Sequence, residues 1–138
     1  MNAGAAGSGG TAQPRSIPPA EPVFADLIPG LRRLADAYRV NTSEVDAEIL
    51  ELFVAEIRKV VTALQQAVAA RDWAGIRWGA HSLQGMGGTI GAPELSVVGV
   101  ELSSAAKRED AARCASLLVG LQEWMRRMAS DGTGGAIG

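Results

Sequence analysis

The sequence lacks several features that mark common classes of protein. Its single cysteine, Cys114, excludes an internal disulfide and fits a reducing compartment. Only 4% of its 138 residues are aromatic, which disfavours a β-sheet core. The 13 Lys and Arg residues do not outnumber the 15 Asp and Glu residues, and the net charge is −2. Without a strongly basic face, nucleic-acid binding is not expected.

Long apolar runs are also missing. No stretch approaches the roughly 20 apolar residues of a membrane span, and the N-terminus shows no signal-peptide pattern. We therefore expect a cytoplasmic protein that does not contact the membrane. Its length of 138 residues and its 47% hydrophobic content suffice for one domain with a real core.

Proline is scarce where the chain is rich in large apolar residues. Four of the six prolines lie in residues 1–22, which otherwise consist mainly of Gly, Ala and Ser. Such a segment buries too little surface to become ordered, so residues 1–22 are predicted to be a disordered, linker-like segment. The glycine-rich residues 130–138 are predicted to be a flexible tail. The predicted domain is 23–129, in which only Pro29 and Pro93 interrupt helix formation.

Apolar residues recur at helical spacing in five segments of this domain. These segments are 26–39, about 43–70, one that opens at Asp72, one that begins near Pro93 and one that begins around Asp110. Their expected apolar stripes are Leu27, Leu31, Leu34 and Tyr38; Ile49, Phe53, Ile57, Val60, Leu64 and Val68; Trp73, Ile76, Ala80, Leu83, Gly87 and Ile90; Leu95, Val98, Leu102 and Ala105; and Cys114, Leu117, Leu121, Trp124 and Met128. Short connections predict an all-α fold, an antiparallel four-helix bundle with an additional short N-terminal helix.

The only histidine of the chain, His81, lies in the third of these helices. On a helical wheel it falls roughly 130° from the centre of the apolar stripe, so we expect an exposed imidazole. Gly85 and Gly88 follow one and two turns later, although each glycine costs about 1 kcal/mol in a helix relative to alanine. We interpret both as clearance around His81 for a partner. Gly75 and Gly79 lie nearer the core and are expected to allow close helix packing.

One exposed histidine limits the chemistry. A metal site needs further convergent ligands, and Cys114 is expected in the core, so no metal site is predicted. General-base catalysis needs an oriented nucleophile or carboxylate, and none accompanies His81. A surface imidazole suits a carrier that takes a group from one protein and hands it to another.

The stretch "AHSLQGMGGTIGA", residues 80–92, resembles the motif of the histidine-containing phosphotransfer (HPt) domain. The preceding "ALQQAVAARDWAGIRWGAHSLQG" and the later "LSVVGVELSSAAKREDAARCASLLVGLQEWM" resemble its flanking helices, so the similarity covers about residues 43–129. The resemblance implies that His81 is the phosphorylated residue and Gly85 the clearance glycine. It implies a phosphorelay intermediate that accepts a phosphoryl group from a receiver-domain aspartyl phosphate and passes it to another receiver aspartate.

Further implications concern cofactors and partners. The domain is expected to bind no cofactor and to have no ATP site of its own, so it is a phosphocarrier and not an enzyme. Mg²⁺ is expected in the partner receiver domain. The expected partners are receivers of a hybrid sensor kinase, of response regulators or of both, and the domain is expected to be a monomer.

Two positions near His81 leave alternatives open. The family usually has lysine where this chain has Gln84, and we expect Arg77, one turn before His81, to supply part of the missing positive charge. Trp78 either packs over the rim onto another helix or anchors a docking receiver. The alternative function is a helical docking module, impaired in phosphotransfer, that binds receiver or kinase domains. A metal or cofactor bundle is a third, poorly supported hypothesis.

Overall fold

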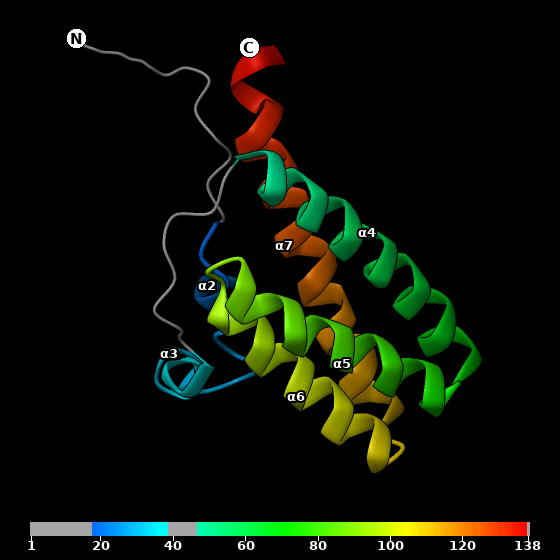
Figure 1. The fold of residues 1–138 in the computed structure, drawn as a ribbon. Coiled ribbons are helices and arrows are strands. Elements are labelled where there is room, and N and C mark those ends of the chain that lie inside the picture. The colour runs from blue at the N-terminus through cyan, green and yellow to red at the C-terminus, as the bar shows by residue number, and fades with distance from the viewer. Residues whose placement is uncertain (1–17, 39–46, 138) are drawn as a thin grey trace, which may run out of the picture.

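The computed structural model describes residues 18–38 and 47–137, with side chains described as far as Met128, and all regular elements in these ranges are helical (Figure 1). Three short elements come first: α2 (Glu21–Phe24), α3 (Leu31–Ala35) and the 3₁₀ helix η1 (Asp36–Tyr38). Four long helices follow: α4 (Ala47–Ala70), α5 (Trp73–Thr89), α6 (Pro93–Lys107) and α7 (Ala111–Ile137).

The four long helices close into a ring. Helix α5 packs against α4 and α6, and α7 packs against the same two neighbours from the other side (Figure 1). The short N-terminal elements lie outside the ring, with α2 on α7 and with α3 and η1 on α6. The predicted all-α, antiparallel four-helix bundle is therefore confirmed. None of the helices described is long and apolar enough to cross a membrane.

All three connections between the long helices use the same backbone device. A residue with positive φ ends each of the first three helices: Arg71 (53°), Gly91 (76°) and Glu109 (56°). The next N–H returns to a carbonyl five residues earlier at 2.8–2.9 Å, as in a Schellman motif. In two connections that next residue is an aspartate, Asp72 or Asp110, whose Oδ1 accepts from the N–H three residues on. Tight connections of this kind force neighbouring helices to run antiparallel.

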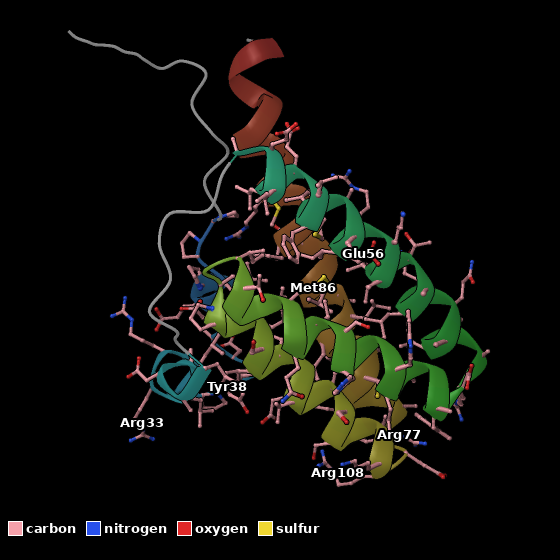
Figure 2. The ribbon with its side chains drawn as sticks, in the orientation of Figure 1. Arg33, Tyr38, Glu56, Arg77, Met86 and Arg108 are labelled. Atoms are coloured by element: carbon pink, nitrogen blue, oxygen red, sulfur yellow. The ribbon has the colours of Figure 1, made fainter. Side chains whose placement is uncertain are left out.

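The apolar stripes predicted for the last two helices are confirmed, because every residue named for them is buried in the bundle core. Charged side chains such as Arg33 and Arg108 point away from the bundle (Figure 2). Cys114 lies fully inside the core, where burial raises the pKa of its thiol. The expectation that this cysteine packs as a small apolar residue is confirmed.

The stripe predicted for α4 is wrong in its first turns. Ile49 remains 46% exposed and Phe53 is only partly buried, whereas Leu50 and Val54 lie in the core. The sequence of this helix offers two apolar series that differ by one residue, about 100° of rotation. Packing against α5 and α7 selects the series that includes Leu50 and Val54, and periodicity alone does not distinguish them.

The single helix predicted over residues 26–39 is also wrong. The chain turns after α2, and Gly30 adopts a φ of 76° just before α3 begins at Leu31. Pro29 disfavours the helical conformation of the residue before it, which breaks the predicted helix in two. As a result Leu31 is buried but Leu34 is 43% exposed. Residue 39 lies outside the described residues.

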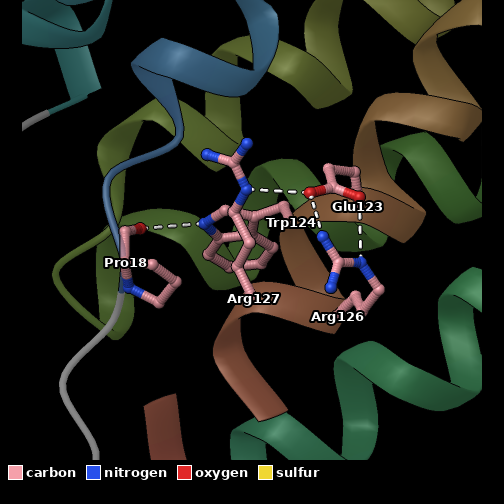
Figure 3. Close-up of polar contacts among 5 residues, drawn as sticks. All are labelled: Pro18, Glu123, Trp124, Arg126 and Arg127. Atoms are coloured by element: carbon pink, nitrogen blue, oxygen red, sulfur yellow. Dashed lines mark hydrogen bonds and ion pairs between the residues drawn. The ribbon is translucent and has the colours of Figure 1, made fainter. Parts of the chain in front are cut away.

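The structure describes part of the chain beyond each predicted domain end. Within the segment predicted to be disordered, residues 18–22 pack on the bundle, and the Pro18 carbonyl accepts a buried hydrogen bond of 2.9 Å from Trp124 Nε1 (Figure 3). Residues 1–17 lie outside the described part. At the other end, α7 continues to Ile137, through most of the predicted tail, since no proline interrupts its backbone hydrogen bonds.

Trp124→Phe is expected to lower the free energy of unfolding by about 1–3 kcal/mol, because it leaves the buried Pro18 carbonyl without its donor. Urea or thermal unfolding measures the change. Trp78→Phe is the matched control, since Trp78 is 62% exposed and its substitution is expected to change stability by about 0.5 kcal/mol or less. Equal effects of the two substitutions would contradict the contribution of the buried bond.

Candidate functional site

Helix α5 presents one face to the core and carries the only histidine on the other. Ile76, Ala80 and Leu83 are fully buried, as the stripe predicts. His81 is exposed, so the outward direction predicted from the helical wheel is confirmed. The helix begins at the side chain of Asp72, which caps its first turn by accepting from the Gly75 N–H.

Two glycines bring α5 and α6 into backbone contact. A Cβ atom at Gly99 of α6 would lie only 2.5 Å from the Ala80 carbonyl oxygen and 2.9 Å from the Gln84 nitrogen. A Cβ atom at Gly87 would lie 2.5 Å from Ser96 Oγ. The same Ser96 hydroxyl donates a 2.7 Å hydrogen bond to the Gln84 carbonyl. This clamp fixes the helix around His81. The packing role of Gly99 was not predicted, although a glycine inside an apolar helix is a signal of close helix packing.

The glycines on the α4 side of α5 have the packing role predicted for them. A Cβ atom at Gly79 would lie 2.7 Å from Leu64 Cδ2, and one at Gly75 would lie 3.2 Å from Ala67 Cβ. Both distances are shorter than ordinary contact. The prediction that Gly75 and Gly79 allow close helix packing is therefore confirmed.

The two glycines after His81 lie in different surroundings. A Cβ atom at Gly85 would have no other atom within 4 Å, so nothing inside the domain requires glycine there. A Cβ atom at Gly88 would lie 3.3 Å from the Tyr38 carbonyl of η1. The interpretation of Gly88 as a residue that clears the open face is thus corrected, because Gly88 lets η1 approach α5. The open patch beside His81 is Gly85 alone.

Trp78 lies three residues before His81 and is 62% exposed. It borders a hollow of about 370 Å³ between α4 and α5, the Trp78 hollow. The other wall comes from α4 at Ala63, Gln66, Ala67 and Ala70, and Asp72 and Gly75 complete the lining. Trp78 therefore leans along the α4 edge while most of its indole stays accessible to a partner.

A second hollow, of about 470 Å³, lies on α5 beyond His81. Ala37 and Tyr38 of η1 form one wall of this Tyr38 hollow, and Ser96 of α6 contributes to it. The rest of the lining is Gln84, Gly85, Gly88 and Thr89 of α5. The position of η1 beside α5 was not predicted, because the local sequence of residues 36–38 contains no pattern that indicates this contact.

Among the described residues near His81, Arg77 is the one that brings positive charge. Arg77 is exposed, is the only Asp, Glu, Lys or Arg of α5, and forms no ion pair within the described ranges. Figure 2 shows it toward the N-terminal end of α5, with Tyr38 beside the other end. On α7, by contrast, Arg126 and Arg127 both donate to the Glu123 carboxylate and hold its pKa at about 2 (Figure 3). These two arginines are occupied, whereas Arg77 is available to an incoming anion.

The arrangement leaves His81 with its ring nitrogens open to a partner. No hydrogen bond or ion pair joins the His81 side chain to any other described residue. Among the described residues, no group of three or more His, Cys, Asp or Glu side chains is placed to hold a metal ion. An exposed imidazole beside a bare backbone patch and a free guanidinium is equipped to receive an anionic group from another protein.

Comparison with known protein families finds a match to one family model. Residues 48–131 match the family model of the Hpt domain, which is more than half of the chain and includes His81 and all or most of α4, α5, α6 and α7. No curated protein and no solved structure gives a significant match.

Proposed function

Because the chain belongs to the Hpt domain family, in which histidine phosphotransfer serves a phosphorelay, we propose that His81 is the residue that carries the phosphoryl group. It accepts this group from a receiver-domain aspartyl phosphate and passes it to the aspartate of another receiver. The observation that supports the proposal best is the exposed, unpartnered imidazole one turn before Gly85, where the domain leaves open space. In this role the domain receives its phosphoryl group from partner proteins.

The transfer is a direct exchange at phosphorus. The lone pair of His81 Nε2 forms a P–N bond as the P–O bond to the donor aspartate breaks, and that carboxylate leaves as an anion. Nδ1 keeps its proton throughout. In the second step the P–N bond breaks, its electron pair returns to Nε2, and the acceptor carboxylate forms the new P–O bond. In-line attack requires close approach of both partners, and the receiver supplies the acidic pocket and Mg²⁺.

Arg77 supplies the charge that the usual lysine would otherwise give. It precedes His81 by four residues and Gln84 follows by three, so both lie on the same flank of the imidazole, about 50° from it, one turn before and one turn after. Arg77 is positively charged and unpaired, whereas the half-buried Gln84 offers a neutral amide. Arg77 is thus placed to offset the charge of the arriving phosphoryl group.

Arg77→Gln is expected to slow phosphotransfer to His81 roughly tenfold, because a cation one helical turn from the imidazole is lost. Gln84→Lys in the same chain is expected to restore most of the rate, since it returns a cation to the same flank. Single-turnover transfer from a phosphorylated receiver measures both. Arg58→Gln, on the exposed outer face of α4, is the matched control. An unchanged rate in Arg77→Gln would contradict this role.

Gly85→Ala is expected to separate stability from function. The added methyl meets no atom of the domain, so the better helix propensity of alanine raises the free energy of unfolding by about 0.5–1 kcal/mol. The same methyl occupies the approach to His81, and transfer is expected to fall roughly ten- to hundredfold. Unfolding curves measure the expected gain in stability, and transfer rates measure the expected loss of activity. A variant that is stabilised and fully active would contradict the clearance role.

The assay that tests the proposed function uses the purified chain, Mg²⁺ and a panel of phosphorylated receivers. The expected product is a phosphate on this chain that is stable in base and labile in acid, as a phosphohistidine is. The alternative, a docking module that no longer transfers phosphate, predicts receiver binding without label from any donor. Absence of label together with absence of binding would overturn both proposals.

A further inference from the structure

The Tyr38 hollow lies immediately beside His81 and includes Gln84 and Gly85 in its lining. Gly85 is four residues after His81 and Gly88 seven, about 6 Å and 10 Å along the helix axis. The wall opposite these glycines is η1, and the 3.3 Å approach of the Tyr38 carbonyl to Gly88 holds it there. The hollow is therefore built by three elements that are distant in sequence.

Phosphotransfer places this hollow inside the contact with the receiver. A specific protein interface buries about 800 Å² on each partner, which is a disc of about 16 Å radius. A receiver centred on His81 therefore covers both Gly85 and Gly88. The Trp78 hollow on the α4 side is covered as well, so a docked receiver meets a hollow on each side of the imidazole.

The lining of the Tyr38 hollow determines what fits in it. None of the described residues that line it carries a charge. The hydroxyls of Thr89 and Ser96 donate to the carbonyls of Gly85 and Gln84, so both donors are used within the domain. A charged side chain would lose its water there without gaining a partner of opposite charge, whereas an apolar side chain loses nothing.

We propose that the Tyr38 hollow is a socket for one apolar side chain of the receiver, on the surface that surrounds its phosphorylated aspartate. This inference rests on the proposed function and deepens it, because it gives η1 a part in the choice among receivers. Receivers with an apolar side chain at the matching position dock well, and those with a charged side chain there dock poorly. Tyr38 is a specificity residue that acts on docking and has no part in the transfer step.

The first test fills the socket with Ala37→Trp. Ala37 is exposed at its rim, and the control Ala115→Trp places the same side chain on an exposed position of α7, across the bundle. Ala37→Trp is expected to raise the KM for the phosphorylated receiver at least about tenfold, with the maximal transfer rate within about twofold of wild type. Labelling of His81 by phosphoramidate is expected to be unchanged in both variants, which shows that the imidazole remains intact.

The second test changes the wall. Tyr38→Ala is expected to raise the KM by a similar factor, while Tyr38→Phe keeps the ring and is expected to remain within about twofold of wild type. Circular dichroism verifies that each variant is folded. If the wild-type chain transfers phosphate and Ala37→Trp has the same KM as Ala115→Trp, the socket is overturned and the proposed function stands. If no receiver in the panel phosphorylates the wild-type chain, the proposed function fails and the socket fails with it.

Discussion

His81→Gln is expected to take no phosphate from any phosphorylated receiver and none from phosphoramidate. The substitution removes the only imidazole of the chain and leaves a neutral side chain of similar size. Because the His81 side chain is exposed and forms no hydrogen bond or ion pair with another described residue, the free energy of unfolding is expected to change by about 0.5 kcal/mol or less. Gel analysis of acid-labile, base-stable label measures uptake, and thermal unfolding verifies that the fold is retained.

The decisive comparison is with receiver binding. His81→Gln is expected to bind an unphosphorylated receiver within about threefold of wild type, since the docking surface is intact and the change lies within the range of surface substitutions. Loss of label with retained binding then identifies His81 as the nucleophile. Label that persists in His81→Gln would place the phosphate on another residue and overturn the assignment.

Gly99→Ala is expected to lower the free energy of unfolding by about 3 kcal/mol. The added methyl would lie 2.5 Å from the Ala80 carbonyl oxygen and 2.9 Å from the Gln84 nitrogen. Both are backbone atoms of α5, so the clash is relieved only when the two helices move apart. Such a shift also weakens the 2.7 Å bond from Ser96 Oγ to the Gln84 carbonyl. Urea unfolding measures the loss.

Gly85→Ala is the matched control, because it adds the same methyl group to α5, the helix that Gly99 contacts. It meets open space and is expected to stabilise the domain, so the two variants change stability in opposite directions. Equal stabilities for Gly99→Ala and the wild type would show that the backbone contact does not set the spacing of α5 and α6.

Helices that contribute one unambiguous apolar stripe could be predicted from the sequence. The stripes of α6 and α7 are buried as expected, and the core face of α5 is correct at Ile76, Ala80 and Leu83. Helix α4 offers two stripes, and the choice between them depends on helices that the local pattern does not contain. The predicted N-terminal helix is wrong for a different reason: its apolar spacing is helical, but Pro29 and Gly30 break it.

The features of the candidate site could likewise be predicted where they depend on the local helix pattern, and not where they depend on distant contacts. The exposure of His81 followed from the position of its own helix's apolar face, and the open space at Gly85 followed from the same wheel. Gly88 and Gly99 have roles that depend on partners far away in sequence: Tyr38 lies 50 residues before Gly88. Tertiary contacts over such separations leave no periodic signal, so the wall of the Tyr38 hollow became visible only in the structure.

The buried bond between Trp124 and Pro18 determines where the described N-terminal segment lies. It fixes the entering chain against α7, which lies across the ring from α5. Pro18 is therefore held on the side of the bundle away from the imidazole. The described N-terminal segment thus packs on α7 and leaves the His81 side chain of α5 exposed.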